Sequence, residues 1–144
     1  EAVELSAVML RKSRIMLHMD LQRDLPLYPA DGSLIGQVVL NFITNAAEAV
    51  RDMEGTKQIT VATAADCSGL SIRIADSGPG VDPRLKEKIF DPFFTTKSGN
   101  SGIGLSLSQR IVHDHGGRVT VKPGPLGGAE FAIMLPVIED MRTN

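Results

Sequence analysis

The segment QVVLNFITNAAEAV, residues 37–50, carries two asparagines one helical turn apart, Asn41 and Asn45. At 100° per residue, these two side chains share an arc of about 80° on a helix with Gln37 and Glu48. Nearly every other direction is apolar or small, so the helix belongs inside a domain. Buried amides need hydrogen-bond partners. The amide stripe is therefore either a paired network in the core or the wall of a polar ligand site.

Composition narrows the class of protein. A chain of 144 residues is long enough for one domain with a hydrophobic core. The net charge is −2 and the basic residues are scattered, which argues against binding to nucleic acid or directly to a membrane. No apolar run approaches the roughly 20 residues that span a bilayer. The single cysteine, Cys67, excludes a disulfide framework and a cysteine-based zinc site, and it fits a cytoplasmic location. Because the sequence starts at Glu1 rather than Met, we expect it to be part of a longer protein.

Hydrophobic periodicity predicts the secondary structure. Residues 1–12 have the pattern of a helix that arrives from upstream. The predicted strands are residues 14–21, 58–66, 70–76, 118–122 and 129–136. The predicted helices run to about Met53 from an N-cap at Asp31 or Ser33, and over 103–115, with a short helical stretch at 84–89. Strands and helices segregate rather than alternate strictly, which favours an α+β two-layer sandwich over a doubly wound sheet.

Asp76 ends the strand LSIRIAD, and counting by twos places it on the same inward face as the apolar residues. A carboxylate there is costly unless it is fully hydrogen-bonded. Gly78 and Gly80 follow in DSGPG and let the backbone turn and approach something closely. One interpretation is an ordinary tight turn capped by Asp76. The other is an acceptor for an exocyclic amino group, with the glycines making room for a flat ring.

A second glycine cluster, NSGIGLSLS, opens the second helix at Gly102 and Gly104. Free amides at a helix N-terminus, together with the helix dipole, form a site for phosphate oxygens. Flexible connectors have the same composition, so the pair alone does not decide. The cluster lacks the Lys-Ser/Thr ending of a P-loop and does not directly follow a strand, so it fits neither that motif nor a Rossmann fingerprint.

The segment FDPFFTTKSGN lies between the two glycine clusters. We expect at least two of Phe90, Phe93 and Phe94 to pack in the core. TTKSGN has no apolar anchor, and a mobile polar segment beside a ligand site suits a lid. Lys97 is there either a phosphate partner or an isolated surface lysine.

The three histidines are not spaced as a metal site. His18 alternates with the apolar residues of its strand, so we expect it to face solvent or a partner. His113 and His115 end the second helix, where a cation suits the helix dipole. We assign none of them a chemical role.

Taken in order, the asparagine helix, DSGPG, FDPFF and SGIGL closely resemble the four boxes of the histidine-kinase catalytic and ATP-binding domain. This Bergerat-fold family also includes DNA gyrase B, mismatch-repair ATPases and a heat-shock chaperone. The resemblance runs from about Leu5 to Pro136, and FDPFFTTK is most similar to the nitrogen-regulatory and oxygen-sensing kinases. It implies a mixed sheet of about five strands with three helices on one face. It divides the chain into a linker-helix tail from an upstream dimerisation domain (1–12), an ATP-binding kinase domain (13–138) and a C-terminal tail (139–144).

The resemblance also implies roles for individual residues. Asn45 matches the asparagine that binds Mg²⁺, Asn41 matches the neighbouring amide near phosphates and metal, and Asp76 matches the aspartate that accepts from the adenine amino group. Lys97 and Asn41 are the catalytic candidates. The remaining nucleotide-binding positions are Gly78 and Gly80 of the first glycine box and Ser101, Gly102, Gly104 and Leu105 of the second.

Four positions distinguish this chain from relatives. The hydrolysing cousins carry a water-activating glutamate where this chain has Asn41, and an amide cannot accept that proton. Many members have a basic residue where Glu48 stands, others carry an arginine at Thr95, and Asn100 replaces the first glycine of the second box. Phosphate binding would therefore rely on Lys97 and backbone amides.

The resemblance implies a sensor histidine kinase of a two-component system. ATP and Mg²⁺ would bind to this domain, and a histidine on a separate dimerisation domain would receive the γ-phosphoryl group. The expected partners are that phosphoacceptor domain, in a homodimer of the full-length protein, and the receiver domain of a response regulator. The alternatives are an ATP hydrolase and a nucleotide-sensing or serine-kinase relative.

Overall fold

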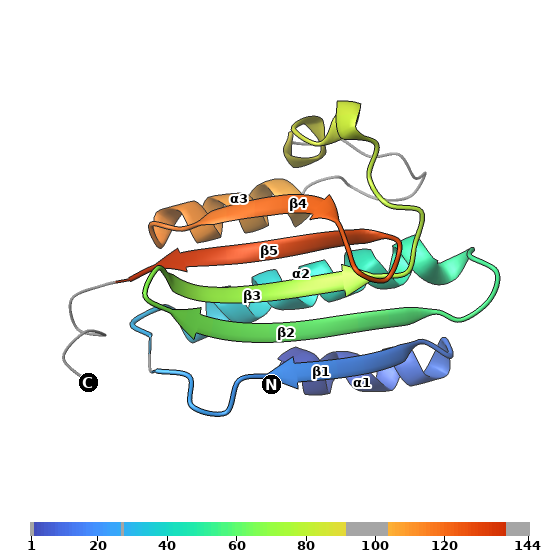
Figure 1. Cartoon of the computed structure of the whole chain (residues 1–144), viewed down its shortest axis with the longest axis horizontal. Coiled ribbons are helices and arrows are strands. Elements are labelled where there is room, and N and C mark those ends of the chain that lie inside the picture. The colour runs from blue at the N-terminus through green and yellow to red at the C-terminus, as the bar shows by residue number, and fades with distance from the viewer. Residues whose placement is uncertain (1, 27, 92–103, 138–144) are drawn as a thin grey trace.

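The computed structural model describes residues 2–26, 28–91 and 104–137, and it shows a mixed five-stranded sheet with three helices on one face (Figure 1). The helices are α1 (Ala2–Lys12), α2 (Gly32–Arg51) and α3 (Gly104–Asp114). The strands are β1 (Met16–Leu21), β2 (Gln58–Asp66), β3 (Gly69–Asp76), β4 (Arg118–Pro123) and β5 (Ala129–Pro136), in the order β1-β2-β3-β5-β4. The predicted α+β two-layer sandwich is confirmed. None of the described helices has the length and apolar character needed to cross a membrane.

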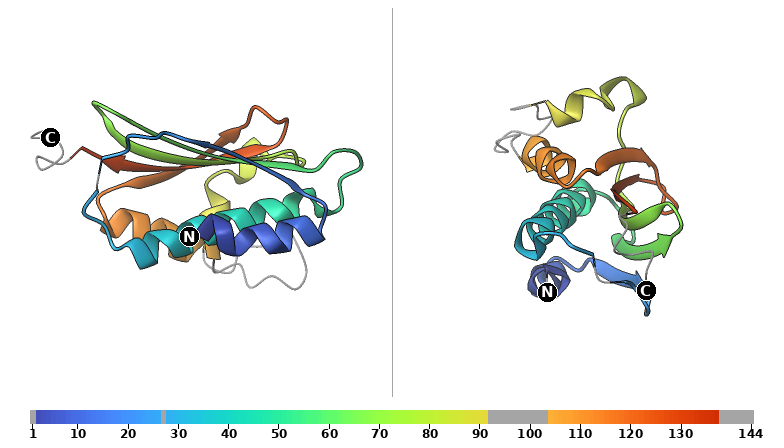
Figure 2. Two further views of the ribbon diagram at one scale, coloured as in Figure 1. Left: turned by 90° about the horizontal axis from the view of Figure 1, so that it is seen from below. Right: turned by 90° about the vertical axis from the view of Figure 1, so that its left-hand side faces the viewer.

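The asparagine-bearing helix α2 lies between α1 and α3, with the sheet above all three (Figure 2). Its apolar side chains Val38, Phe42 and Ile43 are completely buried. Of the two predicted N-caps, Asp31 is the one observed: its Oδ1 accepts a hydrogen bond of 3.1 Å from the backbone N–H of Leu34. The helix is therefore anchored at its start by a cap and along its length by the core.

Strand register sets which side chains meet at each end of the sheet. β1 runs parallel to β2, and β2–β3, β3–β5 and β5–β4 are antiparallel. Asp76 at the end of β3 pairs with Ile59, whereas Asp66 at the other end of this ladder pairs with Gly69. The first strand begins at Met16 rather than at the predicted residue 14, because Arg14 adopts a φ of 59° in the turn that leaves α1.

The structure differs from the prediction at residues 83–90 and agrees with it at the N-terminal helix. The predicted helical stretch at 84–89 forms two separate 3₁₀ turns, η1 (Pro83–Leu85) and η2 (Lys88–Phe90), since so short a segment does not sustain an α-helix. Residues 1–12 do contain a helix, and its Leu10 is 1% exposed in the common core. Whether α1 continues a linker helix from upstream stays a prediction.

The phenylalanines build the aromatic part of the core. Phe131 of β5 lies 5.4 Å from Phe42 and 6.4 Å from Phe90, measured between ring centroids, and the second pair meets edge to face. Core packing is thus confirmed for Phe90, whereas Phe93 and Phe94 lie outside the described residues. The ring of Phe90 anchors the end of η2 to the sheet.

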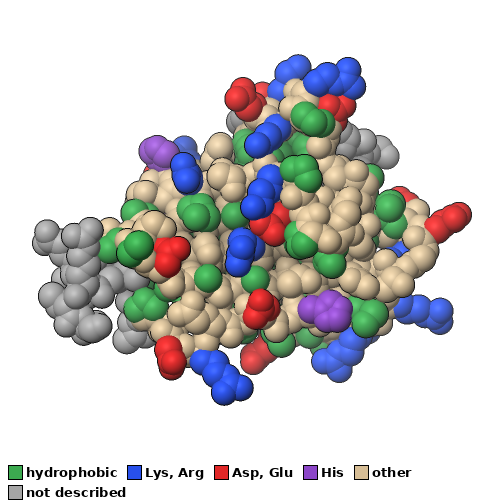
Figure 3. Space-filling view, viewed as in Figure 1, with side chains coloured by type: hydrophobic (Ala, Val, Ile, Leu, Met, Phe, Trp, Pro, Cys, Tyr) green, Lys and Arg blue, Asp and Glu red, His purple; other side chains and the backbone are tan. Residues whose placement is uncertain are grey.

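None of the described helices covers the other sheet face, which shows basic side chains across its middle with acidic groups among them (Figure 3). Glu130 of β5 lies on this face, and its side chain is largely buried, with 9% exposed. Its Oε1 lies 3.5 Å from Nζ of Lys122 on β4. None of the predicted site residues belongs to this ion pair.

Candidate functional site

Asp76 is a buried carboxylate with a fixed orientation. The residue is 2% exposed, and its Oδ1 accepts hydrogen bonds from the backbone N–H of Gly78 at 2.8 Å and of Ala129 at 3.3 Å. Its backbone carbonyl accepts from the N–H of Gly128 at 3.2 Å. The inward position predicted for Asp76 is confirmed. The turn-capping bond to Gly78 is present too, but the bond from β5 goes beyond what a local turn provides.

Two glycines close in on this carboxylate. A Cβ on Gly78 would lie 2.9 Å from the carbonyl oxygen of Ala49 in α2 and 2.9 Å from Oδ1 of Asp76. A Cβ on Gly128 would collide with Asp76 and with the backbone nitrogen of Gly78. Gly80 has a φ of 81°, a conformation that side chains rarely adopt. The close approach predicted for DSGPG is therefore an approach to α2 and to Asp76 itself.

The asparagines lie next to this turn. Asn41 and Asn45 are half-buried on α2, and Ala49, which contacts Gly78, follows Asn45 by one helical turn. Nδ2 of Asn41 donates to Oγ of Ser108 on α3 at 3.3 Å. The turn after β3 therefore contacts α2 at Ala49, and α3 contacts the same helix at Asn41.

The second glycine box is described only in part. Gly104 is the first residue of α3, a Cβ there would meet nothing within 4 Å, and Leu105 is half-buried against the core. Lys97, Ser101 and Gly102 lie outside the described residues, as do Thr95 and Asn100. From the part of this box that the structure describes, Gly104 contributes the N-terminus of α3 and Leu105 contributes an apolar contact to the core.

The side chains of the described residues determine whether the site could bind a metal ion. Among the described residues, no group of three or more His, Cys, Asp or Glu side chains is arranged to hold a metal ion. A divalent cation that keeps most of its waters and bridges phosphates needs only one or two protein oxygens, and the amide of Asn45 can supply one. Beyond Gly80, the guanidinium of Arg84 lies 2.8 Å from Asp82 and lowers the pKa of that exposed carboxyl.

Three contributors to the site were not predicted from the sequence. Gly128 directly precedes the predicted strand 129–136, which begins at Ala129, and Ser108 lies within the predicted helix 103–115. Ala129 is 53 residues away from its partner Asp76 in the chain, and Ser108 is 67 residues away from its partner Asn41. The glycine pair directly before a strand was the available signal, since such glycines often mark close backbone approach.

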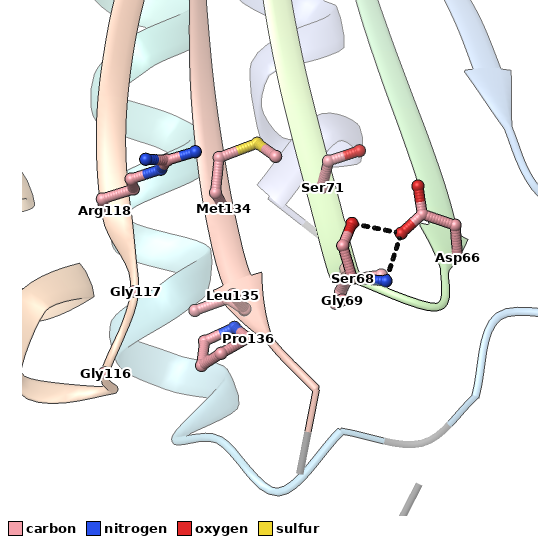
Figure 4. Close-up of a pocket in the computed structure, with 11 residues that line it drawn as sticks. Asp66, Ser68, Gly69, Ser71, Gly116, Gly117, Arg118, Met134, Leu135 and Pro136 are labelled. Carbon is pink, nitrogen blue, oxygen red and sulfur yellow. Dashed lines mark hydrogen bonds between the residues drawn. The ribbon is translucent and has the colours of Figure 1, made fainter. Parts of the chain in front are cut away.

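A groove of about 410 Å³ lies at the opposite end of β3 (Figure 4). Asp66, Ser68 and Ser71 line one side of it, and Gly117 and Arg118 the other. Asp66 bonds to the backbone N–H and the hydroxyl of Ser68 within its own turn. Of the predicted site residues that the structure describes, none lines this groove.

Comparison with known proteins gives consistent matches. Residues 30–139 match the family model described as histidine kinase-, DNA gyrase B-, and HSP90-like ATPase. The histidine-protein kinase AtoS of Escherichia coli (strain K12) is 40% identical over 126 residues, which are 88% of this chain and 20% of AtoS. The chain thus spans about a fifth of this relative's length.

Solved structures agree. The catalytic domain of histidine kinase ThkA is 32% identical with a TM-score of 0.81, over 94% of this chain and 88% of that one. ThkA in complex with the response regulator protein TrrA is 28% identical with a TM-score of 0.81, over 96% and 39%. Full-length ShkA in complex with AMPPNP is 27% identical with a TM-score of 0.78, over 98% and 30%.

Proposed function

Because the chain belongs to the histidine kinase-, DNA gyrase B- and HSP90-like ATPase family, as a catalytic domain of the histidine-kinase type, we propose that it binds ATP with Mg²⁺ and donates the γ-phosphoryl group to a histidine on a separate dimerisation domain. The observation that carries this proposal is the buried, oriented carboxylate of Asp76 beside the amide stripe of α2. ShkA, a structural neighbour, holds an ATP analogue in its full-length form.

In this proposal, Asp76 accepts a hydrogen bond from the adenine amino group. The bonds from Gly78 and Ala129 hold the carboxylate in place before the nucleotide arrives. The base is thereby recognised by a pre-oriented group rather than by one that must reorganise.

The triphosphate and its cation lie further along α2 in this proposal. Asn45 supplies an amide oxygen to Mg²⁺, which neutralises phosphate charge. Asn41 lies one turn away, and the N-terminus of α3 at Gly104 directs free N–H groups toward phosphate oxygens. Outside the described residues, Lys97, Ser101 and Gly102 complete the phosphate contacts.

The amide of Asn41 favours transfer over hydrolysis. A general base must accept a proton from the attacking water, and an amide at neutral pH does not. Phosphoryl transfer requires mainly alignment and charge neutralisation, which a nucleotide-binding domain can provide to an acceptor from another domain. In a homodimeric parent protein, this cytoplasmic domain would therefore work on the upstream phosphoacceptor domain and, through it, on a response regulator. ThkA forms a complex with its response regulator protein.

Titration of the chain with ATP in the presence and absence of Mg²⁺ tests the nucleotide site. Asn45→Ala should remove the Mg²⁺-dependent part of the affinity, measured by calorimetry. Gln37→Ala is the matched control, because Gln37 shares the stripe but is exposed two turns earlier. Equal affinities with and without metal in the unaltered chain would contradict the role of Asn45.

Phosphoryl transfer is tested in the parent protein, with its dimerisation domain present. We expect ATP-dependent, acid-labile and base-stable phosphate, as a phosphohistidine gives. Steady phosphate release by the 144-residue chain alone would favour an ATP hydrolase instead. Acid-stable phosphate on a partner would favour a serine-kinase relative.

A further inference from the structure

We propose that Ser108 of α3 is a positioning residue that holds the Asn41 side chain in place beside the nucleotide site. This inference rests on the proposed function, because it concerns the same site. The contact that carries it is the 3.3 Å hydrogen bond from Nδ2 of Asn41 to Oγ of Ser108, which joins two helices.

The position of Ser108 is unusual for a serine. It is 0% exposed, and the other two buried residues of α3 are Ile111 and Val112, on the face that packs against the core. Apolar residues are the common choice for such a position. A serine within a helix commonly bonds to the backbone of its own preceding turn. Here the hydroxyl oxygen instead accepts a bond from a side chain of α2, which packing alone does not require.

In the observed bond, Asn41 donates to Ser108 and keeps its amide oxygen for other contacts. An asparagine amide carries two donors on its nitrogen and acceptor sites on its oxygen, on opposite sides of the group. With Nδ2 directed at Ser108, Oδ1 is presented on the other side. Water molecules around a divalent cation donate hydrogen bonds, so an oxygen at this place suits a hydrated cation, and an NH₂ group would repel it. Ser108 therefore holds Asn41 where its amide oxygen suits a hydrated cation.

The same contact places α3 relative to α2. Ser108 follows Gly104, the first residue of α3, by one helical turn. The bond to Asn41 consequently fixes the phosphate-facing end of α3 against the helix that carries Asn45. A single hydroxyl thus links the two elements between which the triphosphate would lie.

The test is a double-mutant cycle of Asn41→Ala and Ser108→Ala on Mg²⁺-ATP affinity, measured by calorimetry on the 144-residue chain. Ser108→Ala alone should weaken the affinity by about threefold to tenfold, the factor that the loss of one ordinary hydrogen bond gives. In the Asn41→Ala background the same substitution should have no effect. Ser108→Thr is the matched control, because it keeps the hydroxyl and should keep the affinity within about twofold.

A second measurement needs no nucleotide. The side-chain NH₂ signal of Asn41 in NMR spectra should shift and exchange faster with water in Ser108→Ala, and it should keep its behaviour in Ser108→Thr. Additive effects in the cycle, or an unchanged Asn41 signal in Ser108→Ala, would overturn the positioning role. Unchanged affinity in Ser108→Ala, while the unaltered chain binds Mg²⁺-ATP, overturns this inference alone. No binding by the unaltered chain overturns the proposed function as well.

Discussion

Two aspartate turns at opposite ends of the sheet have the same local hydrogen bond and differ in burial and in the source of their second hydrogen bond. Asp76 and Asp66 each accept a 2.8 Å bond from the backbone N–H two residues later, at Gly78 and Ser68. Asp76 is 2% exposed and takes its next bond from Ala129 of another strand. Asp66 is exposed and takes its next bond from the hydroxyl of Ser68 in its own turn. The local motif therefore does not identify a site; burial and a donor from elsewhere in the fold do.

Close glycine packing does not identify a site either. Gly69, beside Asp66, is pressed against the carbonyl of Leu135, just as Gly128 is pressed against Asp76. What differs is the neighbouring helix. At the Asp76 end, α2 brings Ala49 and the asparagine stripe, whereas the Asp66 end opens into the groove of about 410 Å³. We therefore expect substitutions at the two ends to affect folding similarly and nucleotide binding very differently.

The largest effect is expected for Gly128→Ala. The new methyl group would collide with Asp76 and Gly78, so the free energy of unfolding should fall by about 2–3 kcal/mol and ATP affinity should fall more than tenfold. Gly69→Ala is the matched control, since its methyl group would collide with the backbone of β5. It should destabilise to a similar degree and leave affinity unchanged. Thermal unfolding and calorimetry measure both; equal affinity losses would abolish the contrast between the two ends.

Asp76→Asn should separate recognition from folding. The asparagine oxygen can keep the bonds from Gly78 and Ala129, while its NH₂ group replaces an acceptor by a donor. We expect ATP affinity to fall by about tenfold to a hundredfold, as for a hydrogen bond to a charged group. The melting temperature of the nucleotide-free chain should change far less. Asp66→Asn should alter neither quantity appreciably, and an affinity loss there would show that the groove end contributes to binding.

Much of this contrast was accessible from the sequence. Alternation in LSIRIAD predicted the burial of Asp76, and the cap before α2 was correctly narrowed to two residues, of which Asp31 is observed. Periodicity reports which face of an element is buried, and that face is what these predictions used. The short stretch before Phe90 was predicted as one helical segment, but local pattern does not distinguish an α-helical turn from 3₁₀ turns.

The unpredicted parts depend on strand and helix register. Nothing in the local sequence indicates that Ala129 donates to Asp76 or that Ser108 accepts from Asn41, because the docking of β5 and α3 creates these pairs. His115 shows the same limit. The sequence places it at the end of the second helix, but does not indicate that its Nε2 accepts from the N–H of Asp31 or that its Nδ1 lies 2.7 Å from the carbonyl oxygen of Ile111. These contacts join the start of α2 to the end of α3.

His115→Ala tests whether the end of the molecule that carries the groove stabilises the fold without contributing to nucleotide binding. The substitution removes the link between the end of α3 and the start of α2, so the free energy of unfolding should fall by about 1–2 kcal/mol. ATP affinity should not change, because the link lies at the end of α3 away from Gly104. His113→Ala is the matched control, since His113 lies two residues earlier and is exposed, and its effect should be negligible. Chemical denaturation at neutral pH compares the two variants.

The smallest effect is expected at Asp66, through pH. The side-chain and backbone hydrogen bonds from Ser68 lower the pKa of this exposed carboxyl in the folded chain. A lowered folded-state pKa adds stability above the unfolded-state value of about 3.9, and this stability is lost as the pH falls through the folded-state pKa. Ser68→Ala, which keeps the backbone N–H, should therefore lower the melting temperature by about 1–2 °C at pH 7 and by less than that in strong acid. A difference that grows on acidification would contradict this sign. A change in ATP affinity at pH 7 would instead contradict the structural role of the Asp66 turn, and with it the contrast with Asp76.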